Sequence, residues 1–203
     1  MVKSRIVIIA DSVLDGTVSI EEVWQNYGNM IQGTCNVSTE QEANALVGLY
    51  LRYGIHLDNN GYYKDAKAMY EKTLDVLSNE KKVMSEQSIQ QASEATLYRL
   101  AIVNRKMDND VDAFRQIKVL RNMFPHNDEY KQAYIGCVGN IISKYTNPVY
   151  IIIAVLFLLK MGEVYLTHTH FIPGWLVDAG WILWICMLIV QFGLPWVFKK
   201  ILK

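Results

Sequence analysis

The side chains best suited to chemistry gather in one short stretch near the carboxyl-terminal end of the chain. His168 and His170 form a His-x-His pair, with Glu163 before it and Asp178 after it. Imidazole and carboxylate groups together can ligate a transition metal. A His-x-His pair in a loop is nevertheless a weak metal signal, and the sequence predicts no metal site here. The two carboxylates need another explanation, which comes from the segments that carry them.

No catalytic constellation occurs elsewhere in the sequence. There is no glycine-rich phosphate loop, no H-E-x-x-H zinc motif and no nucleophile elbow. The 20 basic and 20 acidic residues balance, so no net charge draws the chain to nucleic acid. The 3 cysteines lack the pair spacing of a disulfide framework or a zinc site. The sequence thus predicts a protein that is not an enzyme, carries no cofactor and binds no nucleic acid.

The last part of the chain is depleted in charge. Charged residues become sparse after about Asn147, and two apolar stretches follow, at residues 148–166 and 175–198. Each has about 20 residues, enough to cross a hydrocarbon core of ~30 Å as a helix. We therefore expect residues 146–203 to form a transmembrane hairpin in the lipid bilayer; a hairpin buried in a soluble domain is the alternative. Lysines flank its two ends but not its loop, which predicts that both chain termini are cytoplasmic.

Lys160, Glu163 and Asp178 would then lie within the membrane segments, all in the half farther from the cytoplasm. Charged side chains are costly inside a bilayer and need a partner or a function there. Lys160 and Glu163 are three residues apart and would be neighbours on a helix. We interpret the three residues as an intramembrane polar cluster that neutralises its own charge and fixes the hairpin. A polar pathway or a contact within a homo-oligomer is the alternative.

The first 145 residues show helical periodicity, and the alternation typical of strands is absent. Ser19 and Thr39 each precede an amphipathic stretch, with Glu22 and Glu42 three residues further on. This spacing is the capping box of a helix N-terminus. A short helix is also expected at residues 4–14. The sequence therefore predicts an all-α fold.

Residues 46–74 predict two helices that pack closely as a hairpin. Two apolar stripes, one in each helix, are separated by Asn59-Asn60-Gly61. The residues of this break suit a left-handed backbone. Gly54 in the first helix and Ala66 in the second are small enough to let the two helices approach. The stripes consist of Leu46, Tyr50, Tyr53 and Leu57 before the break and of Tyr70, Thr73 and Leu74 after it.

This pattern resembles a tetratricopeptide repeat, in which large, small and aromatic residues recur at fixed places along a helical hairpin. Those places are held here by Tyr50, Tyr53-Gly54, Leu57, Gly61-Tyr62-Tyr63, Ala66, Tyr70 and Thr73. Aligning Ala66 with Ala113 gives a second, weaker copy, shifted by 47 residues. The resemblance implies a TPR-like array at residues 39–145, closed by a capping helix after Pro125. Residues 1–38 would form N-terminal helices that pack on this array.

The same resemblance implies a concave groove, lined by the first helix of each repeat, that binds a protein partner. The implied partner-binding positions are Leu51, Ile55, Asn59, Tyr98, Ile102 and Arg105. One subset of the family clamps the C-terminal carboxylates of chaperones with Lys and Asn at the places that Leu51 and Ile55 hold here. We therefore expect an apolar helix or an extended segment as the ligand. The alternative is that the N-terminal helices of the chain itself fill the groove.

These expectations combine into a membrane-anchored adaptor or scaffold that docks a protein partner at the cytosolic face of a membrane. The plan is similar to that of tail-anchored repeat adaptors such as the mitochondrial fission protein Fis, although those have a single span. Two alternatives are an oligomeric pore or membrane effector regulated by its repeat domain, and a small subunit of a larger membrane complex.

Overall fold

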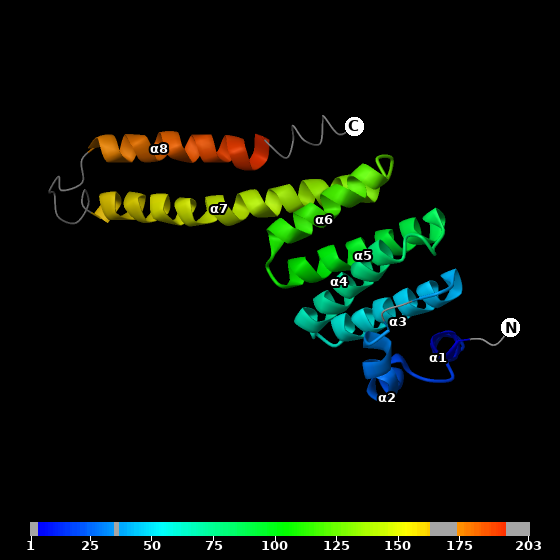
Figure 1. The fold of residues 1–203 in the computed structure, drawn as a ribbon. Helices are drawn as coiled ribbons and strands as arrows, with labels where there is room; N and C mark the ends of the chain where they lie inside the picture. Colours follow the sequence, from blue (N-terminus) through cyan, green and yellow to red (C-terminus); the bar gives the residue numbers. More distant parts are fainter. Residues whose placement is uncertain (1–3, 35–36, 163–173, 194–203) are drawn as a thin grey trace. The chain divides into compact units, whose positions relative to one another are not determined.

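All elements in the part of the chain that the structure describes are helices (Figure 1). The computed structural model describes residues 4–34, 37–162 and 174–193. Two compact units are present, Met1–Met123 and Phe124–Lys203. The prediction of an all-α fold is confirmed.

The first unit is a succession of helices joined by short turns. Its described elements are α1 (Arg5–Leu14), α2 (Ile20–Gln32), α3 (Glu40–Asn59), α4 (Tyr63–Asn79), α5 (Glu86–Lys106) and α6 (Asp110–Met123). Helices α3 and α4 form one hairpin and α5 and α6 another, and the two hairpins pack on each other through α4 and α5 (Figure 1). Helices α1 and α2 pack against α3.

Helices α2 and α3 begin where the predicted capping boxes place them. The Ser19 hydroxyl accepts the backbone N–H of Glu22 at 3.1 Å, and the Thr39 hydroxyl accepts that of Glu42 at 3.3 Å. The Glu42 carboxylate accepts hydrogen bonds from the hydroxyl and the N–H of Ser38, at 2.7 and 3.0 Å. These two donors stabilise the ionised carboxylate and lower the pKa of Glu42 to about 2. The start of α3 is thus fixed by the cap and by an ionised acid beside it.

The predicted break between the helices of the first hairpin is also present. Helix α3 ends at Asn59, and Gly61 adopts a φ of +82°, a conformation that costs glycine little. The chain then reverses and α4 begins at Tyr63. Helix α4 extends to Asn79, and α5 begins at Glu86.

Close packing within the first hairpin depends on Gly54. A Cβ atom at this position would lie 2.6 Å from Cε1 and 2.9 Å from Cδ1 of the Tyr70 ring. Tyr70 is completely buried, so its ring has no free space into which to move. Burial also raises the pKa of Tyr70 to about 12, because the phenolate would lose its hydration. The sequence predicted a close approach at Gly54, and the structure identifies the Tyr70 ring as the group that fills the space.

The second unit contains one long helix and a shorter one. Helix α7 (Asp128–Gly162) continues through Pro148, so the boundary predicted at residues 145/146 falls inside it. No polar break like Asn59-Asn60-Gly61 occurs there to end the helix. Helix α8 (Gly174–Leu188) and the π-helical turn η2 (Ile189–Gly193) lie beside α7 (Figure 1). The Phe157 and Trp181 rings make an edge-on contact between α7 and α8, with centroids 4.7 Å apart.

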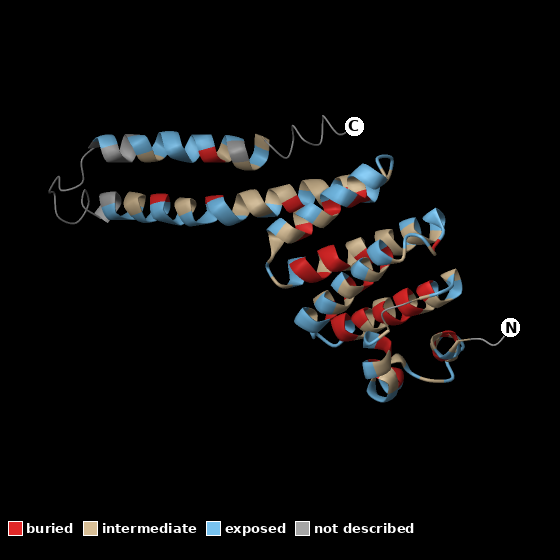
Figure 2. Cartoon of the chain, viewed as in Figure 1, coloured by how far each residue is buried: buried red, intermediate tan, exposed pale blue. Residues whose placement is uncertain are grey.

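The apolar side chains of the two units differ in exposure (Figure 2). Helix α3 buries most of its apolar residues, whereas Ile151, Leu158 and Phe192 in the second unit are 65%, 72% and 67% exposed. Within the described residues, the stretch Asp128–Leu159 is long and apolar enough to cross a membrane, with a mean hydropathy of 1.7 over its most apolar part. The apolar stretch Ala179–Gly193 is shorter. Two membrane spans therefore stay a prediction.

Replacing Gly54 with Ala is expected to destabilise the first unit by about 1–3 kcal/mol, because the added methyl group overlaps the buried Tyr70 ring. Gly48→Ala in the same helix is the matched control. A Cβ at position 48 meets only the flexible Arg52 side chain, at 3.4 Å, so better helix propensity should leave the protein unchanged or up to ~1 kcal/mol more stable. Urea unfolding of the full chain in detergent, followed by circular dichroism, measures both. Equal effects of the two substitutions would contradict the Gly54–Tyr70 contact.

Candidate functional site

The first helices of the two hairpins, α3 and α5, are joined at their N-terminal ends. The Glu40 carboxylate at the start of α3 accepts the backbone N–H of Ser85 at 2.9 Å and the hydroxyl of Ser88 at 3.0 Å. Hydrogen bonds from Ser85 and Ser88 lower the pKa of Glu40 below its ordinary value, because they stabilise the ionised form. Ser85 is itself the N-cap of α5, so the same residues start one helix and attach it to another.

The C-terminal ends of α3 and α5 are joined by an ion pair. The Lys106 ammonium donates to the Asp58 carboxylate at 2.5 Å, and the Asp58 side chain is only 2% exposed. The same ammonium lies 5.1 Å from the centre of the Tyr63 ring at the start of α4. A buried carboxylate is stable only with such a partner. With connections at both ends, α3 and α5 lie parallel and side by side.

A depression of about 510 Å³ lies between these two helices. Leu51, Val47 and Ile55 of α3 supply its apolar wall, while Ala92 and Gln91 of α5 lie opposite. Leu51 and Ile55 also pack partly on the buried cluster that holds Leu57, Tyr70 and Leu100. Their remaining exposed surface faces the depression. Apolar side chains held at the mouth of a depression can contact an apolar ligand without rearranging the core.

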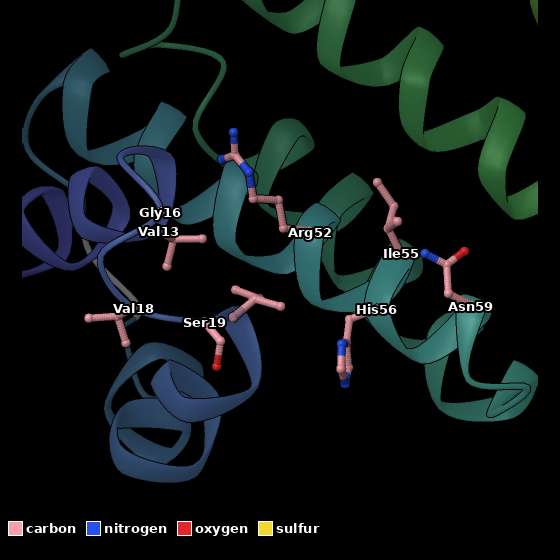
Figure 3. Close-up of a pocket in the computed structure, with 9 residues that line it drawn as sticks. Val13, Gly16, Val18, Ser19, Arg52, Ile55, His56 and Asn59 are labelled. Carbon is pink, nitrogen blue, oxygen red and sulfur yellow. The ribbon is translucent and has the colours of Figure 1, made fainter.

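A second depression of about 510 Å³ lies between α3 and the connection from α1 to α2. Figure 3 shows Val13 near the end of α1 and Gly16 and Val18 of that connection beside α3, from which Arg52 and Ile55 extend. Arg52 and Ile55 thus border both depressions. We call the two depressions and the strip of α3 between them the α3 groove.

Helix α2 is positioned beside the groove by stacked rings. The Trp24 ring stacks on Tyr53 with centroids 4.1 Å apart, and Tyr53 lies parallel to His56 at 6.1 Å. The His56 Nε2 atom lies 3.9 Å from a carboxylate oxygen of Glu21 on α2. Burial, together with the charges of Asp65 and Glu21, raises the pKa of Tyr53. These stacked rings hold α2 against α3. They do not cover Leu51 or Ile55.

The N-terminal helices of the chain pack beside the groove rather than along its floor. Ile9 and Ala10 of α1 and Ile31 of α2 share a buried cluster with Leu46 and Leu49 of α3. That surface of α3 is different from the one that carries Leu51 and Ile55. The described part of α1 therefore forms a wall of the second depression through Val13 and leaves the space itself open.

The predicted partner-binding residues divide into two sets. Leu51, Ile55 and Asn59 border the α3 groove. Tyr98 and Ile102 are half-buried on α5 and Arg105 is exposed there, and none of the three borders either depression.

Sequence reasoning missed Arg52 and the two connections between α3 and α5. The connections join residues 48 positions apart, Glu40 with Ser88 and Asp58 with Lys106. That separation is close to the 47-residue shift used to align the two copies of the pattern. Polar residues about 47 positions apart could therefore have been predicted to lie close together. Arg52 follows Gly48 by one helical turn, and the missing side chain at Gly48 gives the guanidinium room against the helix.

The polar residues of the carboxyl-terminal stretch give no site in the structure. Glu163, His168 and His170 lie outside the described residues, and for Lys160 and Asp178 only the helical backbone is described. Among the described residues, no group of three or more His, Cys, Asp or Glu side chains could hold a metal ion. The arrangement with a clear geometry is the α3 groove, which offers apolar contact and one guanidinium.

Removing the ammonium by Lys106→Met is expected to destabilise the first unit by about 1–3 kcal/mol, because the buried Asp58 carboxylate loses its partner. Asp58→Asn in the same chain should restore part of that loss. A double-mutant cycle in urea gives the coupling free energy directly. Additivity within about 0.5 kcal/mol would show that the pair does not stabilise the packing of α3 on α5.

Comparisons of the chain with family models, with curated proteins and with solved structures found no match. The function therefore has to be inferred from the geometry of this chain.

Proposed function

We propose that the chain is a membrane-anchored adaptor whose TPR-like helical array docks a protein partner at the cytosolic face of a membrane. The observation that carries this proposal is the contrast between the two units. The first unit buries most of its large apolar residues and leaves an open groove, whereas the second exposes large apolar side chains along α7 and α8. An exposed apolar surface of this extent is unfavourable in water and suits a lipid or protein environment.

The anchor in this proposal is a hairpin of two spans. Helix α7 supplies the longer apolar stretch, and residues 174–193 of α8 and η2 would extend about 30 Å at ~1.5 Å per residue. The exposed rings of Trp175, Trp181 and Trp184 on α8 suit a lipid contact, with Trp175 near one interface. Lysines at residues 199, 200 and 203 and Lys144 near the start of the first apolar stretch favour cytoplasmic placement of both ends.

The docking surface in this proposal is the α3 groove. Parallel helices with half-exposed apolar side chains between them accept an amphipathic helix or an extended segment. Anchoring adds a concentration effect, since a partner held at the same surface meets the groove more often than one in solution. Docking and anchoring together require no chemistry from the chain itself.

Membrane insertion predicts that Cys186 on α8, which is exposed in the structure, is protected from a bulky water-soluble maleimide. The experiment uses the full chain in lipid nanodiscs, with Cys35→Ser and Cys137→Ala leaving one thiol. Cys186 should react slowly there and quickly after unfolding in SDS, because a bulky water-soluble reagent does not enter the hydrocarbon core. Ser78→Cys at the exposed end of α4, in a Cys186→Ala background, is the fast-reacting control. Equal rates for the two thiols in nanodiscs would exclude insertion of α8.

Docking predicts a position-specific crosslink in native membranes. A photoreactive benzoylphenylalanine in place of Leu51 should form an adduct with a partner protein, and Ile55→Asp should abolish that adduct by placing a charge on the apolar wall. The same amino acid in place of Val119, which is 45% exposed on α6, is the control. In cells that express the chain without residues 146–203, the captured partner should no longer be found in the membrane fraction. The adaptor proposal fails if the same adducts form at both positions, or if the partner stays on the membrane.

A further inference from the structure

We infer that the segment docked in the α3 groove carries an acidic side chain between two apolar anchors, and that Arg52 is the residue that binds this carboxylate. The inference rests on the proposed docking function and specifies the chemistry of the partner. It depends on where Arg52 lies, on the lack of a partner for its charge and on the apolar walls to either side.

Arg52 occupies the strip of α3 that separates the two depressions and borders both of them. The other residues that line the two depressions are apolar or uncharged, apart from the titratable His56. Arg52 therefore supplies the formal positive charge of the groove as the structure describes it. A ligand that crosses the strip from one depression to the other must pass this guanidinium.

Among the described residues, the Arg52 guanidinium forms no ion pair and donates to no hydrogen-bond acceptor. Three other cations of the first unit form ion pairs: Lys106 with Asp58, Lys67 with Asp112 and Arg115 with Asp112. A Cβ at Gly48 would lie 3.4 Å from an Arg52 guanidinium nitrogen, so the side chain lies back along α3 over the glycine. The guanidinium is thus half-buried at the groove surface with its donors available.

A carboxylate is the group that complements this arrangement. The planar guanidinium binds a carboxylate through two parallel N–H···O bonds, and charge-assisted hydrogen bonds are about twice as strong as neutral ones. Apolar side chains on both sides, Leu51 and Val47 in one depression and Val13 and Val18 in the other, would contact the apolar anchors of the ligand and so reduce the access of water to such a pair. An uncharged apolar ligand would instead cover the guanidinium without replacing its hydration, which is unfavourable.

The carboxylate belongs to an Asp or Glu side chain rather than to a chain terminus. The two depressions are of equal volume, about 510 Å³ each, and Arg52 lies between them. A segment that fills both must continue past Arg52 in both directions. A terminal carboxylate bound to Arg52 would leave one depression empty.

The test selects random peptides displayed on phage against the full chain in phosphatidylcholine nanodiscs. Peptides enriched on the wild type should carry Asp or Glu flanked by apolar residues. For synthetic copies, changing that acid to its amide should weaken binding by about tenfold or more. Arg52→Glu should cause a similar loss and restore binding to the same peptide with Lys in place of the acid. Lys118→Glu, an equal change of charge on the exposed surface of α6, should have no effect.

Three outcomes would overturn the inference. If the enriched peptides are apolar and bind Arg52→Glu as well as wild type, docking in the groove stands but the acidic ligand is wrong. If amidation of the peptide C-terminus abolishes binding while replacing the internal acid does not, the carboxylate is terminal. If peptides bind equally to a Leu51→Asp/Ile55→Asp double variant, the groove is not a docking site and the proposed function fails together with the inference.

Discussion

The α3 groove depends on two polar connections that hold α3 and α5 parallel. Glu40 binds the N-terminal end of α5 through Ser85 and Ser88, and the buried Asp58 binds Lys106 at the other end. The hydrophobic effect that drives apolar helices together is not directional, so it specifies their register less strictly than hydrogen bonds do. Two hydrogen-bonded contacts at opposite ends remove that freedom, because a slip of either helix would break both. The relative positions of Leu51, Arg52 and Ala92 follow from this fixed register.

Packing within the first hairpin adds a steric constraint to these polar ones. The Tyr70 ring occupies the space beside Gly54, and its hydroxyl is buried without a hydrogen-bond partner among the described residues. An unsatisfied buried hydroxyl is unfavourable by about 1–3 kcal/mol. Fully burying the ring contributes about 1.5–3 kcal/mol, which offsets this cost. At this contact the hairpin therefore depends on the steric fit between the Tyr70 ring and Gly54 more than on hydrogen bonds.

The sequence was sufficient to predict the features that are encoded locally. Ser19, Thr39 and Gly61 act within a few residues of themselves, so their effects on helix ends could be predicted and are observed. The close approach at Gly54 could also be predicted, because glycine within an apolar stripe has few other roles. Of the partner-binding positions that the resemblance implies, Leu51, Ile55 and Asn59 border the α3 groove and the three on α5 do not, so a role in binding stays a prediction.

What could not be predicted depends on contacts between distant segments. Nothing near Asp58 in the sequence shows that it will be buried beside Lys106, and a lysine or an aspartate at a helix end is usually solvated. An arginine in a helix is usually an ordinary exposed residue, so the sequence does not distinguish Arg52. Its position between two depressions is seen only when α1 and α5 are placed around α3. The continuity of α7 through Pro148 was missed because the boundary was drawn where charged residues become sparse, and a change in charge density does not by itself end a helix.

The unbroken helix α7 sets a length scale for the proposed adaptor. Its 35 residues extend for about 52 Å, and a hydrocarbon core takes up about 30 Å of that length. Roughly 20 Å of the same rigid rod would then stand above the lipid, without the slack of a flexible tether. The part of α7 outside the lipid would therefore act as a stiff spacer rather than as a flexible linker.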